Sequence, residues 1–296
     1  MLSSDSPLSD IALGLVRRHS IADPNNLLGY VPNPAVTAIV TALYASVSLI
    51  MIALLFQGRS RARYMLTIII VYAAGVALRF VLKHNGSSVG LYAISNSFVV
   101  LSPCAFIAAN YMMLARLARQ IKQAHYLLVG ANVLTRVFVC SDVTTFLIQA
   151  AGGGISTGKS QKSVNLGSNL FIIGLGLQLA SYLFFTAIFL LFLYRVRTRA
   201  PDVWSNSRDT DDQMGNWRTL ALAITISSAG IIIRSIYRVI EGSQGYFGPL
   251  ATNQIVVYTL DSLPLFIAIA IYILIWPGNY IDSQRIREDA EAMELK

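Results

Sequence analysis

The chain of 296 residues is 55% hydrophobic and only 13% charged, whereas about a quarter of the residues in a soluble domain are charged. This composition excludes an ordinary soluble domain and indicates a chain that is solvated largely by lipid. The net charge of +8 would suit a nucleic-acid-binding protein, but the basic residues lie between apolar runs. We therefore attribute them to membrane topology and expect no nucleic-acid partner.

Seven apolar runs follow one another along the chain, each close to the ~20 residues that a helix needs to cross a bilayer. They cover residues 36–56, 64–82, 92–114, 130–151, 166–194, 218–240 and 251–276. The segments between them are polar or glycine-rich and too short for a soluble domain. The pattern predicts an all-α integral membrane protein. Its parts are an extracellular segment at 1–35, a seven-transmembrane-helix bundle at 36–276 and a cytosolic tail at 277–296.

Lysine and arginine are divided unequally between the two sets of connecting segments. One side carries three at 59–63, three at 116–122, five at 195–218 and three at 285–296. The other side carries only Arg17, Arg18, Lys83, Lys159 and Lys162. Because cytoplasmic loops carry the excess of basic residues, we expect the N-terminus outside and the C-terminus in the cytosol. We expect the plasma membrane as the location.

The stretch GGISTGKS at residues 153–160 matches the phosphate-loop pattern G-x-x-x-x-G-K-[ST]. Such a loop cradles phosphate between a strand and a helix N-terminus. Here the glycines follow a membrane helix, and the predicted loop faces outside. We therefore interpret the match as chance, expect no nucleotide there, and interpret Gly152–Gly154 as a tight turn that ends the fourth run.

Several ionisable residues lie within the apolar runs, where they are costly unless they are paired or face a polar cavity. In RSIYRVIEG, residues 234–242, the charges fall at i, i+4 and i+7 and so share one helix face. Counting along each run places most candidates between the bilayer midplane and the outer surface. The predicted substrate-binding residues are Arg79, Asp142, Gln149, Gln178, Arg234, Tyr237, Arg238, Glu241 and Asp261. The alternative is that these charges only pair with one another and fix the helix register.

Other chemistries lack the residues they need. The three histidines lie outside the runs or at their edges, and the last run contains no lysine. We therefore predict no metal site, no cofactor and no enzymatic activity. Cys104 and Cys140 lie in apolar runs and are expected to be buried free thiols. Gly174 and Gly176 predict a close helix approach in the fifth run, and Pro264 predicts a kink in the seventh.

Five blocks in order resemble the fungal RTA1-like family, also called the lipid-translocating exporter family. They are LSPCAFIAANYMMLARL (101–117), FVCSDVTTFLIQAAGGG (138–154), GLGLQLASYLFF (174–185), IRSIYRVIEGSQGYFG (233–248) and YTLDSLPLFIAIAIYILIWPG (258–278). The resemblance implies a seven-span fungal membrane protein associated with drug resistance, meaning tolerance of toxic amphiphiles. The family is linked to release of sphingoid bases, to tolerance of amino-sterols and, in one branch, to porphyrin uptake and haem efflux. Tyr72 and Gln254 stand where the family often has acids, which implies a less acidic pocket here.

Together these observations predict a membrane protein that binds and translocates or exports an amphiphilic, lipid-like substrate, such as a sphingoid base or a sterol-like amphiphile. The predicted partner is thus a membrane lipid or an amphiphilic small molecule. Two alternatives stay open. One is a seven-helix, lipid-sensing receptor or regulator of stress tolerance, and the other is a porphyrin or haem transporter. The oligomeric state is not predicted.

Overall fold

A computed structural model describes residues 42–53 except 48, 89–156, 160–204, 217–244 and 254–275, with side chains left out for 89–103 and 254. The expected second span at 64–82, with Arg79, and the terminal segments 1–35 and 277–296 lie outside the described residues. The labelled elements are α4 (Val89–Gln120), η1 (Ala124–Tyr126), α5 (Ala131–Ser156), α6 (Gln161–Arg199), α8 (Trp217–Ser243), α10 (Gln254–Val256), η3 (Val257–Ser262) and α11 (Leu263–Leu274). An unlabelled helix covers Ala42–Ala53.

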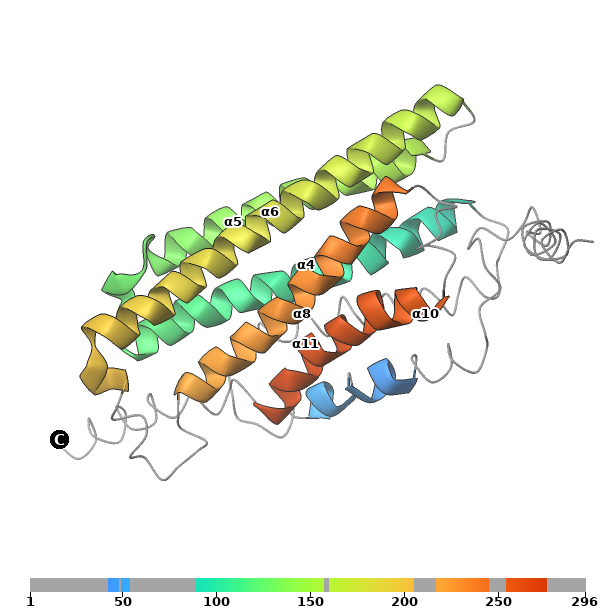
Figure 1. Ribbon diagram of the computed structural model, residues 1–296. Coiled ribbons are helices and arrows are strands. Elements are labelled where there is room, and N and C mark those ends of the chain that lie inside the picture. Colours follow the sequence, from blue (N-terminus) through green and yellow to red (C-terminus); the bar gives the residue numbers. More distant parts are fainter. Residues whose placement is uncertain are drawn as a thin grey trace, which may run out of the picture.

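The described part of the chain is all helical and contains no strand, which confirms the predicted all-α class. Long helices run side by side: α5 packs along α6, α11 packs along α8, and α4 contacts both α5 and α8 (Figure 1). Four helices are long and apolar enough to cross a membrane: Ala131–Ser156, Gln161–Arg199, Trp217–Ser243 and Val257–Leu274. They coincide with the last four apolar runs of the sequence.

The side chains are distributed as lipid solvation requires. Large apolar residues cover the outward faces, among them Leu147, Phe184 and Ile236. The residues buried between the helices include nine polar or charged ones: Asn110, Asp142, Thr145, Gln149, Gln178, Ser227, Ser228, Arg234 and Asp261. Hydroxyl groups that face outward bond within their own helix, as Thr144 does to the carbonyl of Cys140 at 2.9 Å. This arrangement is what a bundle in lipid needs, because the hydrocarbon offers no hydrogen bonds.

Glycines set the approach of α5 to α6, but not by making a turn. The prediction that Gly152–Gly154 form a reversal is wrong, because α5 continues through them to Ser156. A Cβ at Gly152 would lie 2.6 Å from the Phe171 nitrogen and 2.8 Å from the Gly167 oxygen. Only a hydrogen fits between the two backbones here, so the small residue permits direct helix contact.

The predicted close approach in α6 is correct at one of its two glycines. A Cβ at Gly174 would lie 2.6 Å from the Gln149 side chain, whereas Gly176 has open space around it. For the glycines, helix rotation decides the outcome, since residues two apart on a helix point in different directions.

The prediction that both cysteines are buried is correct for one of the two. Neither thiol forms a disulfide within the described residues, and Cys104 is buried as expected, but Cys140 is exposed on α5.

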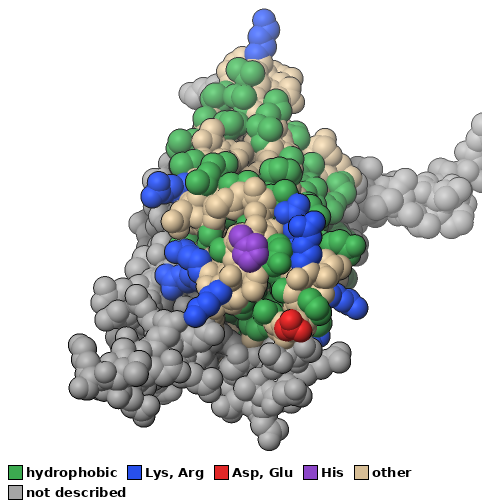
Figure 2. Space-filling model, turned by 90° about the vertical axis from the view of Figure 1, so that its left-hand side faces the viewer, with side chains coloured by type: hydrophobic (Ala, Val, Ile, Leu, Met, Phe, Trp, Pro, Cys, Tyr) green, Lys and Arg blue, Asp and Glu red, His purple; other side chains and the backbone are tan. Residues whose placement is uncertain are grey.

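One end of the bundle is rich in basic residues (Figure 2). The basic residues in the last turns of α4 and α6, Arg119, Arg197 and Arg199, all lie there. The guanidinium of Arg218 at the start of α8 lies over the Trp204 ring, 4.6 Å from its centre. We call this the basic end, and it corresponds to the side that the sequence predicts to be cytosolic.

The last helix is irregular near its start. Residues Val257–Ser262 form a wide π-helical stretch, in which the Leu263 amide bonds to the carbonyl of Tyr258. Pro264 is the second residue of α11, which begins directly after this stretch. Proline lacks an amide hydrogen and clashes with the preceding turn, so a widened turn before it relieves the strain. The sequence predicts a kink at Pro264, and what the structure shows just before this proline is a π segment that contains Asp261.

Candidate functional site

Two arginines, one helical turn apart on α8, converge on a single carboxylate. Arg238 donates two hydrogen bonds to Asp261, from Nε to Oδ1 at 2.5 Å and from Nη2 to Oδ2 at 2.8 Å. Arg234 binds the same carboxylate through Nη1 at 2.9 Å. Arg238 also reaches Glu241, with Nη1 to Oε2 at 3.1 Å. The i, i+4, i+7 spacing on α8 thus produces the shared charged face that the sequence predicts. We call these four residues the ion-pair cluster.

The π-helical stretch positions Asp261 for both arginines. The backbone oxygen of Asp261 accepts a second bond from Arg234 Nη1 at 3.1 Å, and the oxygen of Ser262 accepts one from the Tyr44 hydroxyl at 2.6 Å. Gly230 lets α8 approach α11 here, since a Cβ would lie 2.5 Å from the Pro264 oxygen. A π-helical turn of this kind often marks a functional site, because it re-aims side chains within a helix.

Exposure rises across the ion-pair cluster from the bundle interior outward. The side chains of Arg234 and Asp261 are 7% and 8% exposed, whereas those of Arg238 and Glu241 are 30% and 18% exposed. Two arginines and two acids balance in formal charge. The inner pair is therefore a buried link between helices, and the outer pair is the more exposed part of the ion-pair cluster.

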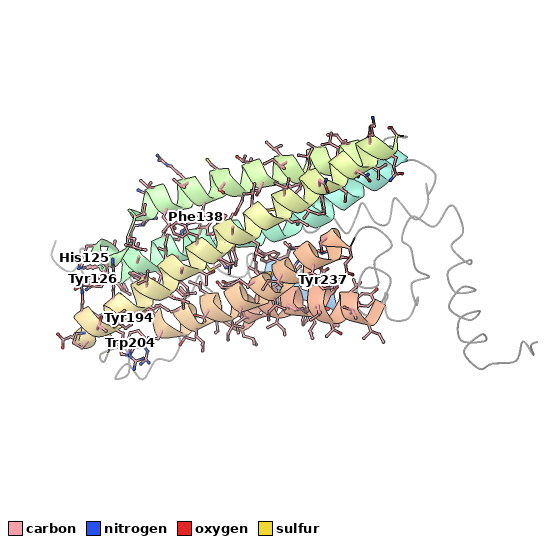
Figure 3. All side chains as sticks on the ribbon, turned by 45° about the horizontal axis from the view of Figure 1, so that its top comes forward. His125, Tyr126, Phe138, Tyr194, Trp204 and Tyr237 are labelled. Carbon is pink, nitrogen blue, oxygen red and sulfur yellow. The ribbon has the colours of Figure 1, made fainter. Side chains whose placement is uncertain are left out.

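The ion-pair cluster lies away from the basic end. Tyr237, which precedes Arg238, is toward the opposite end of the bundle from Tyr126, Tyr194 and Trp204 (Figure 3). Tyr237 is buried at 3% exposure. Its side chain therefore packs inside the bundle.

A second group of predicted site residues joins α4, α5 and α6. Gln149 Nε2 donates to Gln178 Oε1 at 2.8 Å, and Gln178 Nε2 contacts the Cys104 sulfur at 3.0 Å. The remaining acceptor of Gln149, its Oε1 atom, has no hydrogen-bond partner among the described residues. The close passage of Gly174 beside Gln149 holds this pair between the helices. We call this group, together with Asp142, the polar cluster.

Asp142 differs from Asp261 in that none of the described residues pairs it with a cation. It is 3% exposed, and neither carboxylate oxygen has a hydrogen-bond partner among the described residues. The Tyr111 hydroxyl of α4 interacts with it electrostatically, but no bond of good geometry joins the two. The buried hydroxyl of Thr145 bonds instead to the backbone oxygen of Asp142 at 3.0 Å.

The sequence predicts one cavity lined by all candidate residues, and the structure brings the described ones, apart from Tyr237, into these two clusters. Cys104, which Gln178 contacts in the polar cluster, is within electrostatic range of both Asp142 and Arg234. No ion pair between Asp142 and an arginine is formed in the described chain. Arg79, which the sequence also places in the site, lies outside the described residues. The sequence also predicts no metal site. Among the described residues, no group of three or more His, Cys, Asp or Glu side chains that could hold a metal ion comes together.

The sequence prediction missed a third buried group. Asn110 of α4 donates to the Tyr182 hydroxyl at 2.8 Å and accepts from the Tyr272 hydroxyl at 2.6 Å. Tyr182 in turn donates to Ser228 at 3.1 Å, and Asn110 Nδ2 also reaches Ser227 at 3.3 Å. This network joins α4, α6, α8 and α11. An asparagine within an apolar run is the signal that could have revealed it.

The phosphate-loop match at 153–160 does not have the structure that binds phosphate. Residues 153–156 form the last turn of α5, and Ser160 precedes the first residue of α6. The first half of the motif is thus helix, whereas a phosphate loop follows a strand.

Comparison with known proteins places the chain in a family. Residues 65–284 match the family model described as RTA1 like protein. Protein RTA1 of Saccharomyces cerevisiae is 30% identical over 220 residues, which cover 74% of this chain and 66% of that protein. Protoporphyrin uptake protein 1 of the same yeast is 29% identical, with 72% and 68% covered. The yeast sphingoid long-chain base transporter RSB1 is 24% identical, with 66% and 58% covered.

These matched regions leave part of each relative uncovered, since the chain spans slightly less than two thirds of the length of Protein RTA1. No solved structure matches the chain. The family match covers most of the sequence, and four apolar helices of membrane length lie within it. The chain is thus an integral membrane protein that belongs to the RTA1-like family.

Proposed function

We propose that this protein binds an amphiphilic, lipid-like molecule and translocates it across the membrane. The observation that carries the proposal is the partly exposed Arg238, held between Asp261 and Glu241 at the end of the bundle away from the basic end. Charges inside a membrane protein are costly, and they are typical of substrate or ion pathways. The proposed bundle has seven helices, with the N-terminus outside and the ion-pair cluster in the outer half of the membrane.

The chemistry of the ion-pair cluster suits a charged headgroup. A phosphate or carboxylate would compete with Asp261 and Glu241 for Arg238, since a guanidinium binds such groups through two parallel bonds. An amine would compete with Arg238 for the carboxylate of Glu241. A headgroup with both charges would replace both sets of contacts at once. The apolar tail would lie along the lipid-facing surface, where Ile236 and Ile240 of α8 are exposed.

The inner pair would keep the bundle intact during this exchange. If a ligand draws Arg238 away, Arg234 Nη1 still pairs with the carboxylate of Asp261, and it also bonds to the backbone oxygen of that residue. The arrangement thus permits the outer arginine to change partners without leaving Asp261 as an unpaired buried charge, which would cost several kcal/mol.

Two relatives support the substrate class by their names, one as a sphingoid long-chain base transporter and one as a protoporphyrin uptake protein. Both names describe amphiphiles with an apolar body and charged groups. We propose a sphingoid-like or sterol-like amphiphile as the substrate, moved without chemical conversion. We propose the plasma membrane as the location of the protein. A porphyrin is the second candidate, because its carboxylates would suit Arg238.

The test uses purified full-length protein in liposomes that contain a labelled sphingoid base, a labelled amino-sterol or protoporphyrin. The wild type is expected to move at least one of them between leaflets. Arg238→Ala is expected to reduce that rate by ten-fold or more, on the order of the loss of one charge-assisted contact. Arg238→Lys, which keeps the charge but loses the paired donors, is expected to fall in between.

Arg136→Ala is the matched control, because Arg136 is an exposed arginine on α5 outside both clusters. Its rate should equal that of the wild type. If Arg238→Ala and wild type move lipid at the same rate, the proposed site is wrong. If the wild type moves none of the three, yet binds one of them, a lipid-sensing receptor becomes the better explanation. Any release of a chemically altered product would contradict the proposal of transport without catalysis.

A further inference from the structure

The surroundings of Asp142 differ from those of every other described acid. Asp261 and Glu241 both bind arginine, and Asp202 lies exposed near the basic end. Asp142 lies near the middle of α5, is 3% exposed, and has two oxygens without a hydrogen-bond partner among the described residues. An ionised carboxylate in such a place loses its hydration, and no hydrogen bond or ion pair from the described residues compensates for that loss.

Within the described part of the chain, the groups that face Asp142 from neighbouring helices supply no positive charge. Tyr111 and Cys104 face it from α4, and Tyr182 faces it from α6. The two arginines inside the described bundle, Arg234 and Arg238, are engaged by Asp261 and Glu241. An uncharged acid would suit this environment, since its hydroxyl is a donor for the nearby acceptor oxygen of Tyr111.

We infer that Asp142 is a proton-binding site of the transport cycle. A proton from the aqueous phase forms an O–H bond with the carboxylate and leaves when that bond breaks, so the group alternates between a neutral and a charged form. Carboxylates buried in membrane helices serve as proton relays in pumps and transporters. Cys104 is within electrostatic range of both Asp142 and Arg234, and so relates this site to the ion-pair cluster.

The inference that a proton is carried during turnover rests on the proposed transport function, but the proton-binding site itself does not. Its test is therefore made first without transport. The full-length protein in lipid nanodiscs is titrated with acid and base, and infrared difference spectra record the carbonyl stretch of protonated carboxylic acids. The wild type is expected to show a titrating band that disappears in Asp142→Asn, a substitution that keeps the size of the side chain.

Two further variants make this result specific. Asp202→Asn removes an exposed acid and should leave the band unchanged. Tyr111→Phe keeps the Asp142 carboxyl but removes the hydroxyl that interacts with it, so the band should remain and move in frequency. A spectrum without a carboxylic-acid band at any pH, or a band that persists in Asp142→Asn, would overturn the assignment. If Asp142→Asn does not fold, an unmoved band in Tyr111→Phe would overturn it instead.

The coupling to transport is then measured in liposomes with an imposed pH gradient. Lipid movement by the wild type should change several-fold with the direction of the gradient, and Asp142→Asn should lose this response. An equal response in both proteins would overturn the coupling. If the wild type moves no lipid, the proposed function fails, while the infrared result still decides whether Asp142 binds a proton.

Discussion

At the scale of single residues, Asp261 is the carboxylate on which the described charges depend. It accepts bonds from two arginines, one of them almost fully buried, and its own backbone oxygen accepts a third contact. Removing one partner of a buried ion pair is far more damaging than removing an exposed one, because the remaining charge has lost its hydration. Glu241 is the natural comparison, since it pairs with the same Arg238 from a more exposed position.

Asp261→Asn is expected to lower the free energy of unfolding by about 3–5 kcal/mol, the range for breaking a buried pair. Glu241→Gln is expected to cost less than about 1 kcal/mol, as for a surface pair. Thermal unfolding of both variants in detergent, monitored by circular dichroism, measures the difference. Equal melting temperatures for the two would show that the Arg234 link does not stabilise the bundle.

At the scale of helices, glycine decides how closely α5 and α6 approach each other. Gly152 and Gly153 are neighbours in sequence and both lie within α5, but only Gly152 faces α6. The sequence reveals a run of small residues at this place. It does not reveal which of them faces the partner helix, because that depends on how α5 is rotated in the bundle.

Gly152→Ala is expected to destabilise the protein by about 1–3 kcal/mol, because the added methyl group would meet the backbone of Phe171 and overpack the contact. Gly153→Ala should be neutral or stabilise by up to about 1 kcal/mol, since alanine is the better helix former. The free energy of unfolding of the two variants is measured under the same conditions. The comparison is direct, because the same chemical change is made at adjacent positions. A cost at Gly153 equal to that at Gly152 would contradict the predicted contact.

The Asn110 network connects helices that are far apart in sequence. Tyr272 of α11 reaches Asn110 of α4, and both are buried. Tyr272→Phe leaves a buried acceptor without its donor and is expected to cost about 1–3 kcal/mol. Tyr194→Phe removes the hydroxyl of an exposed tyrosine at the basic end and should change nothing. The melting temperatures of the two variants check this, and a stable Tyr272→Phe protein would show that the bond contributes little.

At the scale of the whole molecule, the distribution of charge predicts the orientation. Basic residues gather at the end where α4 and α6 finish, and the ion-pair cluster lies away from that end. The excess of Lys and Arg on one side predicts that the basic end faces the cytosol. The orientation therefore determines from which side a substrate would meet Arg238.

Cysteine labelling tests this orientation. In a background without Cys104 and Cys140, Ser160→Cys at the start of α6 is expected to react with a membrane-impermeant maleimide on intact cells. Thr198→Cys at the other end of α6 should react only after permeabilisation. Both positions are exposed, so access to the reagent and not burial decides the outcome. The reverse pattern would invert the predicted topology.

The sequence by itself determined the class of the protein, the last four membrane helices and the shared face of Arg234, Arg238 and Glu241. These follow from the length of the apolar runs and from helical periodicity, which are local properties. Only the tertiary structure decided that Asp261 accepts both arginines and that Asp142 stays apart from them. It also decided that Gly152 is a contact and not a turn. Those outcomes depend on helix rotation and on the π-helical turn before Pro264, which are set by packing between distant segments.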